Sequence, residues 1–188
     1  MKGPVEIGVC RGAGCALPRV VARFAVDPHL TKVAEGVTHT ARDPGYEARV
    51  RASFARQAAM ATLGAEIAHL APGEVDLRMS YRAELTQQHG FVHAGIVATL
   101  ADSACGYAAF TLMPADAAIL SVEFKLNLLA PAAGDAFVAR ARVKKAGRTL
   151  SVVTADVFAL RDGEGEERLV ATMQGTMMTV LDRPGLSG

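Results

Sequence analysis

One stretch of the chain is apolar on every side. From Ala94 to Pro114 it contains mostly small or apolar residues and no internal proline. A run of this length is typical of a helix, and a helix that is apolar all round must be buried on all sides. The pattern therefore predicts a long buried helix over residues 94–112, and the rest of the chain is interpreted around it.

The sequence before this helix predicts one shorter helix and two strands. Apolar residues recur at helical spacing from Val50 to Ala58, which indicates a helix that begins near Tyr46. Two alternating segments, 63–71 and 75–82, follow on either side of the turn signal Pro72-Gly73. Alternation of apolar and polar residues is typical of half-buried strands, so we expect a hairpin here.

The sequence after the helix is almost entirely strand. Segments 120–128, 137–144, 150–160 and 169–180 are separated by turns rich in Gly, Pro and Asp. In the first of them the apolar positions Leu120, Val122, Phe124, Leu126 and Leu128 alternate with the polar positions Ser121, Glu123, Lys125 and Asn127. Strands joined by short turns form an antiparallel sheet. We therefore predict an α+β fold with a curled antiparallel sheet around the central helix. The apolar surface left over favours a homodimer or a dimer of dimers.

The composition fits one globular domain with weakly structured ends. Of 188 residues, 51% are hydrophobic and 21% are charged, which is enough for a sizeable core. Residues 46–182 are predicted to form this domain. Residues 1–45 show no sustained period and are predicted to be an extension, and residues 183–188 to be a frayed tail.

Charge and hydropathy exclude several classes of partner. The net charge is +1, with acids and bases interspersed, so we expect neither nucleic acid nor a membrane surface as a partner. No continuous apolar segment follows Lys2, and the expected location is therefore the cytoplasm. A membrane span over the central helix is disfavoured, because Asp102 near its centre would cost about 2.5–3.5 kcal/mol on insertion.

Cysteines and histidines predict neither disulfides nor a metal. Cys10, Cys15 and Cys105 are an odd number, and no ligand pair follows the first two at metal-binding spacing. His89 and His93 are four residues apart, but the glycines beside them argue against a helix and no third ligand is evident. We expect no metal and no cofactor.

Asp102 is the candidate for chemistry in the buried helix. No Lys or Arg accompanies it in that run. A lone carboxylate there is costly unless hydrogen bonds satisfy it or its protonation changes, so it is either a functional group or a structural acceptor. Cys105 is interpreted as a buried small thiol, because the neighbouring carboxylate would raise its pKa. No Gly-x-Ser-x-Gly motif is present, which excludes an α/β-hydrolase.

The segment QQHGFVHAG and the helix that follows it resemble the PaaI-type hotdog-fold acyl-CoA thioesterases. Members of that family have a Gln or Asn, a His-Gly-Gly six residues later, and an Asp or Glu nine residues after the His. These positions are Gln87, His93 and Asp102 here. The resemblance covers about residues 46–180. The family's His-Gly-Gly appears as His93-Ala94-Gly95, and a backbone N–H donor survives that change if φ stays negative.

The resemblance implies hydrolysis of an acyl-CoA or aryl-CoA thioester. Asp102 would act as general base or nucleophile. Gln87 and the N–H groups at Ala94 and Gly95 would polarise the thioester carbonyl, because a helix N-terminus offers unpaired donors to a developing oxyanion. His93 would orient the loop before the helix.

The resemblance also implies that two subunits share each site. Ala94 and Asp102 are eight residues apart, about 12 Å along a helix, so one chain cannot place both at one carbonyl. Arg148 would hold a CoA phosphate, or it is simply a solvated residue of a basic turn. Two alternatives stay open, a non-catalytic acyl-CoA-binding protein and an enoyl-CoA hydratase-like enzyme. Hydratases of this fold carry a His five residues after the Asp, where this chain has Tyr107.

Overall fold

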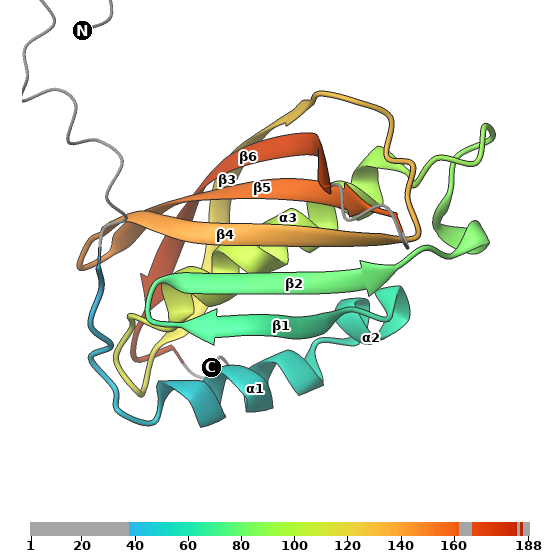
Figure 1. The fold of residues 1–188 in the computed structure, drawn as a ribbon. Coiled ribbons are helices and arrows are strands. Elements are labelled where there is room, and N and C mark those ends of the chain that lie inside the picture. Colours follow the sequence, from blue (N-terminus) through green and yellow to red (C-terminus); the bar gives the residue numbers. More distant parts are fainter. Residues whose placement is uncertain (1–37, 162–166, 184, 186–188) are drawn as a thin grey trace, which may run out of the picture. The chain divides into compact units, whose positions relative to one another are not determined.

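The computed structural model describes residues 38–161, 167–183 and 185. The predicted extension lies outside the described residues up to position 37, and so does most of the predicted tail. The elements follow one another in the order shown in Figure 1. They are α1 (Tyr46–Arg56), α2 (Ala58–Leu63), β1 (Glu66–Ala71), β2 (Glu74–Ser80), a 3-10 turn (Ala83–Leu85), α3 (Ala94–Phe110), β3 (Ala118–Leu128), β4 (Ala136–Ala146), β5 (Leu150–Leu160) and β6 (Glu167–Val180).

The sheet has six strands in the order β1-β2-β4-β5-β6-β3, and every neighbouring pair is antiparallel. It curls around α3, which crosses its inner face in Figure 1. This arrangement confirms the prediction of a curled antiparallel sheet around one long helix. No helix in the described part of the chain is long and apolar enough to cross a membrane.

The buried core lies between α3 and the inner face of the sheet. Leu100, Ala101 and Ala104 of α3 are completely buried, as are Val75 and Leu77 of β2. The alternating pattern predicted for β2 therefore corresponds to its inner and outer faces. Burying one of the larger apolar side chains stabilises the fold by about 1.5–3 kcal/mol. The packing of these side chains therefore holds α3 against the sheet.

The first predicted strand begins later than its alternation suggested. Residues up to Leu63 belong to α2, and Gly64 ends that helix in the left-handed conformation with φ +65°. Glycine is favoured there because it has no side chain to clash. The alternation of Leu63, Ala65 and Ile67 is too short to distinguish a strand from the last turn of a helix. The expectation of a strand from residue 63 was wrong for that reason.

Arg49 of α1 binds the C-terminal end of α3. Its Nη2 donates to the carbonyl oxygens of Phe110 at 3.2 Å and Met113 at 3.0 Å, and its Nε donates to Asp43 at 2.9 Å. The guanidinium also lies 4.1 Å from the centroid of the Phe110 ring. A cation at this end satisfies carbonyls that the helix leaves unpaired and complements the helix dipole.

Strand β3 forms one edge of the sheet, and a β-bulge changes which of its residues face α3. Ser121 pairs with Met177, and Glu123 pairs with the next residue back, Thr176, so Val122 is the extra residue. Met177 is completely buried, which places Ser121 on the inner face. The strict alternation of the sequence put Ser121 on the polar outer face. Ser121 lies on the inner face instead, because a bulge inserts one unpaired residue and shifts the period.

Candidate active site

The loop before α3 is a tight turn that presents the Gln87 side chain. Thr86 and Val92 form an isolated antiparallel bridge. Within it, the Gln87 N–H donates to the carbonyl of Phe91 at 2.9 Å, and the Gly90 N–H donates to the carbonyl of Gln87 at 3.0 Å. Gly90 has φ +81°, a conformation that glycine adopts without strain. The turn therefore fixes the backbone from which the Gln87 side chain projects.

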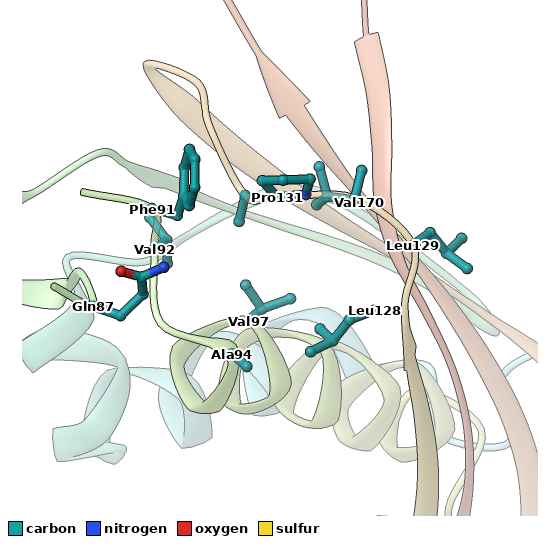
Figure 2. A pocket seen from close by; sticks show the side chains of 11 residues that line it. Gln87, Phe91, Val92, Ala94, Val97, Leu128, Leu129, Pro131 and Val170 are labelled. Atoms are coloured by element: carbon teal, nitrogen blue, oxygen red, sulfur yellow. The ribbon is translucent and has the colours of Figure 1, made fainter. Parts of the chain in front are cut away.

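The amide of Gln87 is oriented by the same turn. Its Oε1 accepts a hydrogen bond from the backbone N–H of His89. This bond assigns the oxygen to the turn and leaves the Nε2 group as a donor. Gln87 is one of the residues that line the cavity at the start of α3 (Figure 2). An amide donor is therefore available at that cavity.

His93 is the N-cap of α3 and binds one of the helix's first N–H groups. Its backbone is extended, and its Nδ1 accepts from the Gly95 N–H at 2.9 Å. The His93 carbonyl accepts from Ile96 and Val97. The first N–H of the helix, at Ala94, has no acceptor among the described residues. Of the two donors expected at Ala94 and Gly95, the one at Ala94 is thus left unpaired.

The cavity beside these donors has apolar walls. Its volume is about 460 Å³, and Figure 2 shows Gln87 and Ala94 on one side of it with Leu128 and Val170 across from them. The other lining residues are Phe91, Val92, Val97, Leu129, Ala130, Pro131 and Ala132. The cavity is open to solvent on the side of Leu128 and Leu129, which are 56% and 53% exposed, so its walls shield a group at the Ala94 N–H only in part.

Asp102 lies on the part of α3 that the sheet leaves partly exposed, and it does not line this cavity. Its Oδ1 accepts a hydrogen bond of 2.7 Å from the Ser121 hydroxyl. Its Oδ2 accepts none from the described residues. The two predicted halves of the site, the donors at Gln87 and Ala94 and the carboxylate of Asp102, are therefore not brought together within one chain.

Ser121 is the one polar contact of Asp102 that sequence reasoning missed. The alternation of β3 gave no reason to place this hydroxyl near α3. The bulge at Val122 turns it toward the helix, and bulges often re-aim side chains next to functional sites. The only local signal for this contact in the sequence is a serine in a largely apolar segment. Such serines are too common to predict a contact with Asp102.

Two side chains of α3 near Asp102 are not placed for chemistry. Cys105 is buried, and burial together with the Asp102 charge raises the pKa of its thiol well above the usual range. Burial also raises the pKa of Tyr107. Both groups therefore stay protonated near neutral pH. Within the described residues, no three His, Cys, Asp or Glu side chains gather closely enough to hold a metal ion.

Arg148 lies at the far end of the sheet from the cavity of its own chain. It follows β4 in an exposed turn, whereas the cavity is formed beside Ala132, before β4 begins. The 11 residues of β4 separate the two places, roughly 35 Å at the usual rise of a strand. Arg148 therefore cannot reach a ligand in the cavity of the same chain.

Comparisons with known proteins agree with this fold. Residues 89–166 match the family described as the thioesterase superfamily. A solved thioesterase family protein from Silicibacter pomeroyi is 60% identical, covers 73% of this chain and 99% of its own, and superposes with a TM-score of 0.71. A protein of Halobacterium salinarum named "Putative esterase" is 32% identical over 64% of this chain and 83% of its own length.

A more distant structure shares the fold. The Escherichia coli PaaI protein from the phenylacetic acid degradation operon is 22% identical, covers 76% of this chain and 95% of its own, and has a TM-score of 0.65. The identity to the Silicibacter protein over nearly its whole length is far above what fold similarity alone produces. The chain therefore belongs to the thioesterase superfamily, as a hotdog-fold enzyme that hydrolyses thioesters.

Proposed function

We propose that this enzyme hydrolyses acyl-CoA thioesters to the free acid and CoA. The observation that carries the proposal is the unpaired N–H of Ala94 beside the donor amide of Gln87, both on an apolar cavity. A thioester carbonyl placed against these two donors would develop its negative charge where the helix dipole is positive. This arrangement supports acyl transfer to water rather than simple binding.

Asp102 supplies the second half of the proposed reaction. As a general base, its carboxylate takes a proton from water while the water oxygen bonds to the thioester carbon. The tetrahedral intermediate then expels the CoA thiolate, which takes up a proton, and the acid is released. As a nucleophile, Asp102 would instead attack the thioester carbon and expel the CoA thiolate, which takes up a proton, and water would then hydrolyse the resulting acyl anhydride to the free acid and the Asp102 carboxylate. The bond between Ser121 and Oδ1 leaves Oδ2 available for either role.

The carboxylate and the donors come from different subunits in this proposal. Eight residues of helix separate Ala94 from Asp102, about 12 Å, so one chain cannot apply both to one carbon. The edge strand β3 supports a dimer, because Val122, Phe124 and Leu128 are 53%, 46% and 56% exposed there. A long apolar edge strand is a surface that proteins normally cover by pairing.

Pairing of two β3 strands also gives Arg148 a role. If the two strands pair antiparallel, the end of the partner's sheet that carries its β4–β5 turn lies beside the cavity of the first chain. The partner's Arg148 would then reach the phosphates of a CoA bound in that cavity. The Arg148 of the chain that forms the cavity is too far away to do so. A guanidinium binds phosphate well because its planar donors match the oxygen geometry.

Release of free thiol from a panel of CoA thioesters tests the proposed function. The panel contains acetyl-, hexanoyl-, decanoyl- and phenylacetyl-CoA, the last because of the operon named for the E. coli relative. We expect turnover of at least one thioester, and a loss of at least about 10³-fold in Asp102→Asn with the dimer intact, because base and nucleophile are removed together. No hydrolysis of any CoA thioester, or unchanged turnover in Asp102→Asn, would contradict the proposal.

A further inference from the structure

The run of α3 and its C-terminal cap from Ser103 to Met113 is buried at every position except Gly106. Gly106 lies one helical turn beyond Asp102 on the same stripe of the helix. A Cβ atom built at Gly106 would meet nothing within 4 Å in this chain. The structure of the single chain therefore gives no steric reason for a glycine there.

Glycine at this position has a cost without a visible local benefit. In the middle of a helix, glycine is less favourable than alanine because it has more backbone freedom to lose on folding. Neither a positive φ nor a close backbone approach within the chain requires it. The open space beside Gly106 is therefore available to the substrate or to the partner subunit.

The neighbours of Gly106 define where its open side lies. On one flank, α1 and the residue after it cover α3, since Gln57 Nε2 donates to the Ser103 hydroxyl at 3.4 Å and the Phe54 ring lies 5.5 Å from the Tyr107 ring. On the other flank, β3 reaches the helix through Ser121. The surface left open between these flanks runs from Asp102 to Gly106.

We propose that Gly106 sets the depth of the acyl-binding site, with the end of the acyl group lying over it. This inference rests on the proposed function, which places the thioester carbon at the Asp102 carboxylate. An acyl group that continues along the helix from that carbon reaches Gly106 after one turn, about 6 Å. A methyl group at position 106 would occupy the space of the chain's end. The acceptable substrates are therefore medium-length or aryl groups rather than acetyl alone.

The variant Gly106→Ala tests this depth directly. The ratio of kcat/KM for hexanoyl-CoA to kcat/KM for acetyl-CoA should fall at least tenfold, since one methylene in an apolar pocket changes discrimination by about 10- to 200-fold. The midpoint of thermal unfolding should rise by a few degrees, because alanine favours the helix. Ala59→Val, which adds methyl groups at an exposed position of α2, is the matched control and should leave the acyl-length profile unchanged.

Each other outcome overturns the inference. An unchanged ratio in Gly106→Ala, while wild-type protein hydrolyses the thioesters, shows that the acyl group does not reach this position. Dissociation of the dimer or a lower unfolding midpoint shows that the partner subunit fills the space instead. Failure of the wild-type protein to hydrolyse any CoA thioester would refute the proposed function itself. This outcome is seen with wild-type protein alone, so it cannot be confused with a failure of the inference about Gly106.

Discussion

Ser121 donates a hydrogen bond of 2.7 Å to Asp102 Oδ1, from a strand that the sequence pattern turns the other way. This bond holds one carboxylate oxygen and so limits the rotation of the side chain. A hydrogen bond to a charged group is stronger than one between neutral groups. Ser121 is therefore a positioning residue for the proposed catalytic carboxylate.

Replacing Ser121 should lower kcat more than it changes KM. We expect Ser121→Ala to reduce kcat by roughly 10- to 100-fold, because a hydrogen bond to a charged group is worth about 1.5–3 kcal/mol. Ser121→Thr keeps the hydroxyl and should restore part of the loss. Ser151→Ala is the matched control, since Ser151 pairs with the same Met177 on the buried face of the sheet but on a different strand. Equal losses in Ser121→Ala and Ser151→Ala would show a structural role only.

The N–H of Ala94 can be removed without breaking the helix. Proline is well tolerated at the first position of a helix, and the preceding His93 has φ −61° and ψ 139°, which a following proline permits. Ala94→Pro should therefore fold and lose about 10²- to 10³-fold in kcat, the usual effect of one oxyanion donor.

The control for this variant is Ala58→Pro. Ala58 is the first residue of α2 and also follows an extended residue, Gln57. The same substitution there should leave kcat close to the wild-type value. Circular dichroism and steady-state kinetics of both variants separate a lost donor from a damaged helix. Wild-type kcat in a folded Ala94→Pro protein would mean that this N–H does not contact the substrate.

Subunit exchange tests whether each site combines two chains. Asp102→Ala and Ala94→Pro proteins should each be inactive, and equal mixing gives heterodimers with one intact and one doubly altered site. If pairing is random, activity should return to about a quarter of wild type, because half of the dimers each have one good site of two. Exchange is verified with differently tagged chains. Verified exchange without recovered activity would place both functional groups in one chain.

A charge on the exposed edge should weaken the dimer. Val122→Lys places a cation on β3, and lysine on an edge strand opposes pairing with another edge. Light scattering at micromolar concentration should then report a smaller mass than for wild type. Ala68→Lys places the same charge on β1, the opposite edge of the sheet, and should leave the mass unchanged. The reverse result would assign the dimer contact to β1.

The buried thiol of Cys105 predicts a loss of stability at alkaline pH. Because burial raises its pKa in the folded state, the protonated thiol is favoured by folding, while the unfolded chain loses its proton above about pH 8.5. This contribution is fully present below that pH and decreases as the pH rises beyond it. Thermal unfolding between pH 7 and 10 should show a smaller decline in Cys105→Ala than in wild type. Identical declines would show that the thiol does not contribute.

The elements set by hydrophobic period were predictable, and those set by local backbone geometry were not. The apolar run that forms α3 and the alternation that forms β2 appear directly in the residues, because each period has one dominant structure. The end of α2 depends on a left-handed Gly64, and the orientation of Ser121 depends on a bulge. Neither the left-handed glycine nor the bulge alters the hydrophobic pattern of its segment, so neither could be predicted from that pattern. The resemblance to the family pointed to Gln87 and Ala94 as candidate donors, whereas the engagement of the Gly95 N–H by His93 is visible only in the folded structure.

The bulge at Val122 decides which face of β3 carries Ser121. Deleting Val122 would leave Ser121 opposite Met177 and Glu123 opposite Thr176, so both residues would keep their faces and Asp102 would keep its hydrogen-bond donor. If β3 instead retained Val122 and paired regularly through it, the residues before it would exchange faces, so that Leu120 would point toward α3 and Ser121 toward solvent. The one unpaired residue thus corrects an alternation that would otherwise separate Asp102 from its donor without altering either of them.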